Sequence, residues 1–304
     1  MDWLKNIKET LNLDKIVAPV NNARRYYQML ENLMDLVNDS KVSNSVKDMV
    51  SGLGTILKSQ PNIMSINHFL NHWLLRIDPE NQPIVIKELL EVFHERWKNV
   101  DRKTAHTAYA NFDFHEKTII FHGADKSIES FVELMAVNQK KIDIIQTMAK
   151  PAINSRHQAT EFATHTFGLQ IINAEAAGNF LAKADALVIP ASIIMRDEFV
   201  APIGTYLLAA ACKGLNKPLF IFGDTRKILS KKYFPESVFD SLIGESAKPP
   251  GEVWKGAPKN AVVFNQYIEI VPNEFVTHFM LENNAFTPEQ ITEQVDKVLI
   301  TKLF

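Results

Sequence analysis

Residues 183–223 have the sequence KADALVIPASIIMRDEFVAPIGTYLLAAACKGLNKPLFIFG, and this stretch decides the fold. It contains two short apolar runs, ALVI and LFIF, with the helical pattern IGTYLLAAACKG between them. Runs that are apolar at nearly every position are typical of strands buried on both faces of a parallel sheet. The stretch therefore predicts a strand, a helix and a second strand, with a loop between the first strand and the helix that is placed to hold a functional site.

The same alternation extends over most of the chain after residue 115. Strand patterns occur in KTIIFHG, KIDIIQTM, LQII, ADALVIPA and KPLFIFG, and helical patterns lie between them in DKSIESFVELMAVNQ, SRHQATEFATHTFG, AEAAGNFLAK and IGTYLLAAACKG. This order predicts βαβ units and a Rossmann-like, doubly wound, mostly parallel α/β sheet. A later pair, the strand pattern AVVFNQYIEIVP and the helical pattern PNEFVTHFMLEN, is expected to extend it.

The first hundred residues instead predict helices, among them ARRYYQMLENLMDLVND and PIVIKELLEVFHERWKNV. We therefore predict an all-helical N-terminal domain over residues 1–112 and a Rossmann-like C-terminal domain over residues 113–304. A long excursion rich in Pro, Gly and Lys is predicted at residues 230–259. His68 and His72 lie four apart on one predicted helix, but no third ligand is near them, so we predict no metal site.

Composition argues against several classes of protein. A formal net charge of -2 argues against direct nucleic-acid binding, which usually requires a basic excess. A single cysteine, Cys212, excludes an intrachain disulfide and fits a reducing compartment. No apolar run reaches the roughly 18 to 20 residues of a membrane span, and the N-terminal residues have no signal-peptide pattern. We expect a cytoplasmic protein without a membrane partner.

Polar residues follow the predicted strands at the edge where ligands bind in open α/β sheets. Basic side chains near helix N-termini favour an anion there, because backbone N–H groups and the helix dipole add to their charge. The predicted ligand-binding residues are Lys126, Lys150, Arg156, Ser192, Gly204, Thr205 and Lys227. Arg226, Asp125, Asn154 and Ser155 fall in the same loops. The pattern predicts a phosphate pocket, with solvated loop charges as the alternative.

Cofactor motifs are missing from the sequence. It has no GxGxxG fingerprint, and GADKS lacks the spacing of a P-loop. Cys212 lies in the middle of a predicted helix on an apolar face, which is typical of a buried structural thiol and not of a nucleophile. We therefore expect no cofactor.

Six segments of the chain resemble the translation initiation factor 2B alpha/beta/delta family, whose relatives include methylthioribose-1-phosphate and ribose-1,5-bisphosphate isomerases. In chain order they are SQPNIMSINHFLNHWLLRI, TMAKPAINSRHQA, KADALVIPAS, APIGTYLLAAACKGLNKPLFIF, TRKI and YIEIVPNEFVTHFMLENNAFTPEQI. The resemblance is spread over most of the chain. It implies the two-domain fold and a homodimer formed through the C-terminal domains.

The resemblance also implies how the family's isomerases convert an aldose phosphate to a ketose phosphate. They use a cysteine after the first strand, a position that falls at Gly123 or its neighbour in this sequence. Their aspartate after the fourth strand falls at Ser192 or at Ala191, depending on the alignment of the loop. An Asn-Lys pair that binds substrate is matched by Ala201-Pro202, and proline lacks even a backbone donor.

Three functions stay open on the sequence. The first is an initiation factor 2B regulatory-subunit-like protein that is non-catalytic, binds a phosphorylated small molecule and acts in regulation or assembly. The second is an aldose–ketose isomerase with a rearranged acid–base pair, in which His122 acts with Asp197 or Glu198. The third is a structural partner whose pocket binds nothing.

Overall fold

The computed structural model describes His68, Glu88 and residues 91–93, 95–150, 152–165, 168–229 and 249–297. Most of the helical domain predicted over residues 1–112 therefore lies outside the described residues, as do His72 and residues 230–248 of the predicted excursion. In the described part, no helix is both long enough and apolar enough to cross a membrane.

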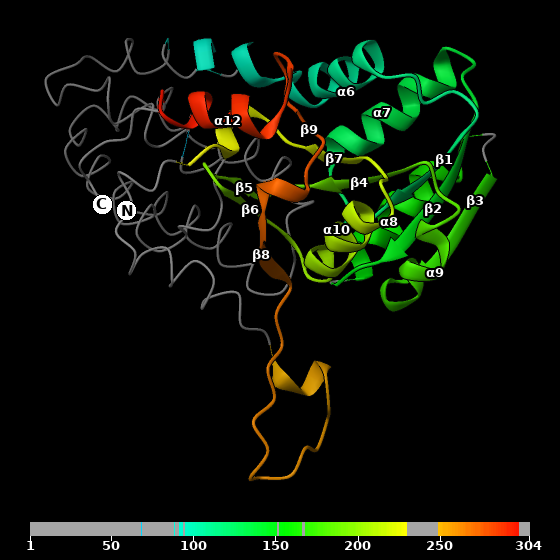
Figure 1. Ribbon diagram of the computed structural model, residues 1–304, viewed down its shortest axis with the longest axis vertical. Coiled ribbons are helices and arrows are strands. Elements are labelled where there is room, and N and C mark those ends of the chain that lie inside the picture. Colours follow the sequence, from blue (N-terminus) through cyan, green and yellow to red (C-terminus); the bar gives the residue numbers. More distant parts are fainter. Residues whose placement is uncertain are drawn as a thin grey trace, which may run out of the picture.

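A seven-stranded sheet in the order β10-β9-β7-β4-β1-β2-β3 forms the centre of the fold (Figure 1). All its neighbouring strands are parallel except β9 and β10, which pair antiparallel. The strands are β1 (Lys117–Phe121), β2 (Ile142–Met148), β3 (Gly168–Asn173), β4 (Ala186–Pro190), β7 (Leu219–Phe222), β9 (His278–Met280) and β10 (Ala285–Phe286). The five strands predicted as continuous apolar runs are thus confirmed, and so is the mostly parallel α/β sheet.

Helices cover both faces of this sheet (Figure 1). On one face lie α6 (Val100–Asn111), α7 (Lys126–Val137) and α8 (Ala152–Phe162); on the other lie α9 (Ala177–Leu181), α10 (Thr205–Gly214) and α12 (Pro288–Val295). Successive residues of β1 feed the two cores in turn, since Ile119 and Phe121 pack toward α7 while Ile120 packs toward α9 and α10. Cys212 of α10 is fully buried, as expected, and burial raises the pKa of its thiol to about 12 against a smaller opposite effect of Lys217.

A second, three-stranded antiparallel sheet contains two strands from the segment that was expected to be a loop and one from the later predicted strand. It joins β5 (Ile193–Ile194), β6 (Glu198–Pro202) and β8 (Ile268–Pro272) in the order β5-β6-β8. The apolar residues on either side of the turn at Arg196 and Asp197 form this hairpin because their side chains are buried. The prediction that the strand now seen as β8 extends the main sheet is therefore wrong.

The prediction of a helix for the segment PNEFVTHFMLEN is also wrong. The segment forms a 3-10 turn, η7 (Asn273–Phe275), and then strand β9, which pairs with β7. A strand fits better because Phe279 and Met280 are both fully buried, one in each core, and only a strand sends successive side chains to opposite faces.

Residues 249–266 form an arm that projects from the body of the molecule (Figure 1). Its two ends are fastened together, since Asn265 Nδ2 donates to the carbonyl of Pro249 at 3.0 Å and to Glu252 Oε2 at 2.9 Å. The hydroxyl of Tyr267 donates to the same Glu252 carboxylate. The arm continues beyond the predicted excursion, into residues that had been assigned to a strand.

Candidate functional site

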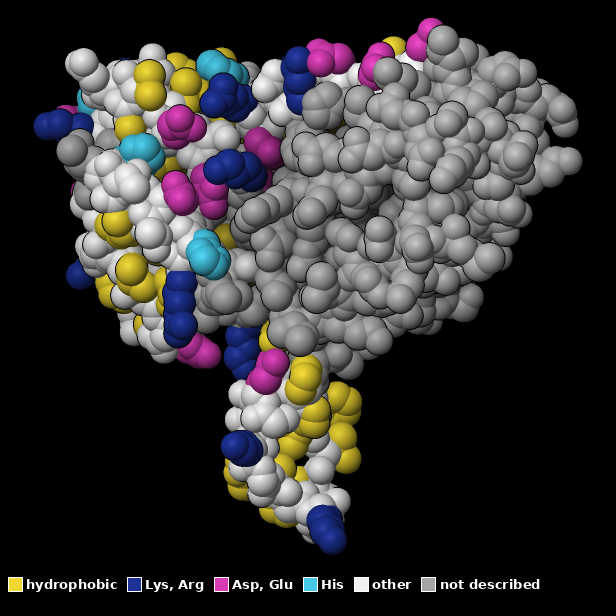
Figure 2. Space-filling view, turned by 180° about the vertical axis from the view of Figure 1, so that it is seen from behind, with side chains coloured by type: hydrophobic (Ala, Val, Ile, Leu, Met, Phe, Trp, Pro, Cys, Tyr) yellow, Lys and Arg dark blue, Asp and Glu magenta, His cyan; other side chains and the backbone are white. Residues whose placement is uncertain are grey.

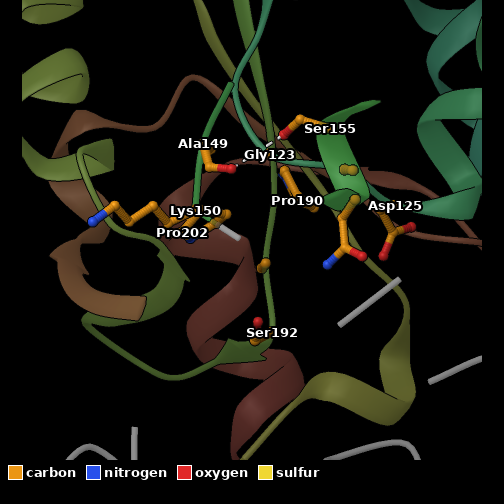
Figure 3. Close-up of a pocket in the computed structure, with 11 residues that line it drawn as sticks. Gly123, Asp125, Ala149, Lys150, Ser155, Pro190, Ser192 and Pro202 are labelled. Carbon is orange, nitrogen blue, oxygen red and sulfur yellow. Dashed lines mark hydrogen bonds between the residues drawn. The ribbon is translucent and has the colours of Figure 1, made fainter. Parts of the chain in front are cut away.

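A small cavity lies at the carboxyl edge of the sheet between the ends of β1, β2 and β4 (Figure 3). This is where strand order reverses, because β2 and β3 follow β1 on one side while β4 and β7 lie on the other. The lining residues are Gly123, Ala124, Asp125, Ala149, Lys150, Asn154, Ser155, Pro190, Ala191, Ser192 and Pro202. The cavity volume is about 30 Å³, which is room for a small anion but not for a sugar ring.

Gly123 has no space for a side chain. Its φ of +94° favours glycine, and a Cβ at this position would lie 2.7 Å from Pro202 Cγ and 3.1 Å from Pro190 Cγ. The two prolines therefore occupy the volume into which a side chain at position 123 would project.

Two buried glutamines hold the loop that follows β1. Gln146 Nε2 and Gln158 Nε2 each donate to the carbonyl of Gly123 at 3.1 Å, and the backbone N–H of Asp125 donates to Gln158 Oε1 at 3.0 Å. Gln158 also donates to Gln146 Oε1 at 2.9 Å. Neither glutamine was predicted from the sequence to have a role. The signal for Gln146 was a polar residue within the otherwise mostly apolar run KIDIIQTM.

His122 is fully buried and both its ring nitrogens have partners. Nε2 lies 3.0 Å from the carbonyl oxygen of Ile203, so Nε2 carries the proton, and Nδ1 accepts from the Thr147 hydroxyl at 2.9 Å. Burial lowers the pKa of His122 to about 4, although backbone hydrogen bonds with Ile203 and Pro202 act in the opposite direction. The neutral ring thus joins β1 and β2 to the segment before α10.

Asn154 is the buried polar residue of the cavity. It lies in the first turn of α8, its exposed fraction is 6%, and its side-chain amide has no hydrogen-bond partner in the described part of the chain. The neighbouring Ser155 hydroxyl donates to the Ala149 carbonyl at 3.4 Å (Figure 3). Although Asn154 as a whole is largely buried, its amide atoms are not sealed from solvent, so they are open to water or to a ligand at the cavity.

Asp125 and Lys150 lie on opposite sides of the cavity in Figure 3. The Asp125 carboxylate caps α7 by accepting from Ser127 N at 3.0 Å, and its other oxygen accepts from Lys227 Nζ at 3.0 Å. Lys150 is exposed and has no carboxylate partner among the described residues. The cavity therefore has a neutralised carboxylate on one side and Lys150 on the other, with the lysine ammonium group pointing away from the cavity in Figure 3.

Further carboxyl groups lie behind Asp125. Asp224 holds the Arg226 guanidinium at 2.7 and 3.0 Å, and this pairing lowers the pKa of Asp224 to about 2 in spite of burial. Burial, and then the charges of Asp125 and Asp224, raise the pKa of Asp101 in α6 to about 7. Three carboxyl groups thus lie together behind the cavity with the two cations Arg226 and Lys227.

Comparison with protein families matches residues 21–288 to the model of the Initiation factor 2 subunit family. The chain belongs to this family. A putative translation initiation factor eIF-2B subunit 2-like protein of Pyrococcus abyssi is 24% identical over 229 residues, which cover 74% of this chain and 79% of that protein. A ribose 1,5-bisphosphate isomerase of Thermococcus kodakarensis is 23% identical over 257 residues, 80% of this chain and 78% of that enzyme.

Solved structures of translation initiation factors share the fold. The translation initiation factor eIF-2B of Pyrococcus horikoshii OT3 superposes with a TM-score of 0.71 at 18% identity, covering 93% of this chain and 97% of that one. A chain from the tetrameric eIF2B-beta2-delta2 complex of C. thermophilum gives a TM-score of 0.69 at 13% identity, covering 95% and 93%. At identities this low, the structural similarity shows that the fold is shared and says nothing more.

The structure brings together two of the predicted ligand-binding residues of this family member, Lys150 and Ser192, which both line the cavity. Lys126 is instead paired with Glu129 at 2.7 Å, and Arg156 lies on α8, exposed and outside the lining. Lys227 reaches the site only through its ion pair with a lining residue.

Gly204 and Thr205 begin α10, outside the cavity lining. The backbone N–H of Tyr206 in the first turn of that helix donates to Glu269 Oε1 at 2.8 Å, so a carboxylate already occupies the helix N-terminus. Asp197 and Glu198 lie at the turn of the β5–β6 hairpin, which packs against η7, and neither lines the cavity.

Proposed function

We propose that this chain is a non-catalytic, regulatory-subunit-like member of the Initiation factor 2 subunit family that binds the phosphate group of a small molecule at the carboxyl edge of its sheet. The observation that carries the proposal is the cavity at the ends of β1, β2 and β4, which Asn154 lines with a side-chain amide that is open to a ligand and has no protein partner in the described residues. Ser192 and Lys150 also line the cavity, and in Figure 3 the Lys150 ammonium group points away from the other lining residues. Regulation or assembly is the role that fits binding without turnover.

Phosphate suits these groups chemically. The first turn of α8 presents backbone N–H groups and the positive end of the helix dipole. Asn154 Nδ2 and the Ser192 hydroxyl supply neutral donors, and Lys150 supplies positive charge at the edge of the cavity. A tetrahedral anion fits a cavity of about 30 Å³, in which oxygen atoms occupy the positions of water-sized spheres.

The proposal of a non-catalytic role rests on the groups around Gly123. Proton transfer between adjacent carbons requires a group within hydrogen-bond reach that can accept and return a proton. Position 123 has no room for a side chain, and His122 is buried with both nitrogens engaged. The Asp125 carboxylate is already held by Lys227 and Ser127.

A sugar-phosphate isomerase is the alternative, because relatives in the family carry that name over a similar share of the chain. A turnover assay separates the two functions. Ribose 1,5-bisphosphate and methylthioribose 1-phosphate are each incubated with the protein and followed by carbon-13 NMR. We expect no ketose product. Conversion of either substrate to its ketose by the native protein, lost in the His122→Asn variant, would contradict the non-catalytic proposal.

The binding proposal is tested by thermal unfolding with inorganic phosphate and ribose 5-phosphate. A ligand at 100 times its dissociation constant adds about 2.7 kcal/mol to the free energy of unfolding. Lys150→Ala is expected to weaken binding by roughly 10- to 100-fold, since a hydrogen bond to a charged group contributes about 1.5 to 3 kcal/mol. Lys183→Ala removes another exposed lysine outside the lining and serves as the matched control.

We also propose a homodimer formed through the C-terminal domain, with the arm as part of the interface. Apolar side chains gather along the arm in Figure 2. Val262 and Phe264 are 79% and 82% exposed, and Trp254 is 56% exposed. Large apolar side chains this exposed on a fastened, projecting segment are typical of a protein interface. Oligomers occur in the family, as in the tetrameric complex from C. thermophilum.

A further inference from the structure

Most of the large apolar side chains that are exposed in the described part of the chain gather on two elements. Ten such side chains are exposed there, and seven of them lie on the arm, on α10 or on the residue that follows α10. The arm carries Val253, Trp254, Val262 and Phe264. Single exposed apolar residues are ordinary on a protein surface, whereas a cluster of them marks a place where another molecule packs.

The outer face of α10 is apolar along its length. Leu207 and Leu215 are 76% and 44% exposed, and their spacing of eight residues puts them on one face of the helix. Tyr206 packs edge-on against Phe275, with ring centroids 5.6 Å apart, and the Lys213 ammonium group borders this surface at 5.3 Å from the centre of the Phe275 ring. We call Tyr206, Leu207, Leu215 and Phe275 the α10 face.

The arm and the α10 face adjoin at the root of the arm. The backbone N–H of Ile203, just before α10, donates to the carbonyl of Tyr267 at 2.9 Å, and that of Tyr206 donates to Glu269 Oε1 at 2.8 Å. From this root the arm leaves the body of the molecule (Figure 1). Phe264 therefore stays exposed while Leu207 of the same chain stays uncovered, so neither surface covers the other within one copy.

A second copy related by a two-fold axis buries both surfaces at once. In such an interface the same patch of each copy takes part, so an arm that contacts α10 of the partner has its own α10 contacted in return. Charge agrees with this arrangement. Lys255 and Lys259 of the arm have no ion pair within the described ranges, and Glu269 beside the α10 face has no basic partner there.

We propose that the arm of each copy lies across the α10 face of the other copy. This rests on the proposed homodimer and identifies the surface that receives the arm. The apolar side chains of the arm then bury those of the α10 face, with the lysines of the arm at the polar rim of the contact.

Two variants test the crossed contact by complementation in the full chain. Phe264→Ser alters the arm and Leu207→Ser alters the α10 face, so the homodimer of either variant has both of its contacts altered. A mixed dimer keeps one native contact, between the arm of the Leu207→Ser copy and the α10 face of the Phe264→Ser copy. We expect the dimer dissociation constant of each variant to rise roughly 30-fold or more.

Analytical ultracentrifugation of the two variants, apart and mixed, gives the decisive result. We expect the mixture to form dimers at a concentration at which neither variant does alone, which also shows that both variants fold. The matched control is Val137→Ser, because Val137 is an apolar residue of α7 that is 73% exposed, close to the 76% of Leu207. This control should dimerise as the native chain does.

Three results would contradict the crossed contact. A Leu207→Ser variant that dimerises as tightly as the native chain, while Phe264→Ser does not, overturns it and leaves the proposed homodimer intact. Two monomeric variants whose mixture stays monomeric also overturn it, because packing of arm on arm or of α10 on α10 has no native contact to restore. A native chain that is monomeric refutes the homodimer and the crossed contact together.

Discussion

Gly123 packs directly against Pro202, so closely that a Cβ at position 123 would lie 2.7 Å from Pro202 Cγ. The glycine lies in the loop between β1 and α7 and the proline ends β6, so this contact joins the main sheet to the small one. The proline therefore fills the space into which a side chain at position 123 would project.

Gly123→Ala is expected to destabilise the protein by about 2 kcal/mol or more, because it combines a positive φ with a steric overlap. Pro202→Ala removes the overlapping Cγ, so the double variant should lose less stability than the sum of the single variants. Urea unfolding measures all three. Gly178→Ala in α9 is the control, since nothing lies within 4 Å of its added Cβ. If the losses of stability in the two single variants add up fully in the double variant, the methyl group added at position 123 does not collide with Pro202.

Asp101 should make stability depend on pH. Its pKa is raised from 3.8 to about 7 in the folded protein, so between these values the folded state holds a proton that the unfolded state releases. This contribution is fully present below about pH 4 and is lost as pH rises through 7. Asp101→Asn should match the native protein near pH 4 and exceed it at pH 8, by on the order of 2 kcal/mol.

Chemical unfolding of the Asp101→Asn variant across this pH range checks the prediction. Asp143→Asn removes an exposed carboxylate at the start of β2 and should leave the pH profile unchanged. A parallel offset of the Asp101→Asn curve at every pH would show that the carboxyl group does not titrate in this range.

The arm should be required for self-association. Phe264→Ser and Val262→Ser remove large exposed apolar groups and are expected to convert the dimer to monomer in light scattering at micromolar concentration, without lowering the unfolding temperature. Val137→Ser changes a residue that is 73% exposed on α7 and should leave the dimer intact. A native chain that is monomeric, or arm variants that stay dimeric, would refute this interface.

The central strands β4 and β7 could be predicted because they are apolar at nearly every position, as strands buried on both faces require. The small sheet could not be predicted, since β5 has only two residues and β8, which pairs with β6, lies far from it in the sequence. The same limit applies to β9, whose residues also fit a helical period until pairing with β7 decides their conformation.

The site could be predicted only in part. Lys150 and Ser192 follow from their positions just after strands, because the carboxyl ends of parallel strands meet at one edge. Whether a lysine is available depends on partners distant in sequence: Lys227 is neutralised by Asp125, and no local pattern signals that pair. The lack of a partner for Asn154 is likewise a property of the folded chain.

The most direct measurement is thermal unfolding of the native protein and of Asn154→Leu, each with and without phosphate. Leucine has a similar size and removes the amide that lines the cavity, so the variant is expected to fold but to lose a hydrogen-bond donor to the anion. We expect phosphate to raise the unfolding temperature of the native protein and not that of the variant. A folded variant that still responds fully to phosphate would contradict the claim that Asn154 binds the anion.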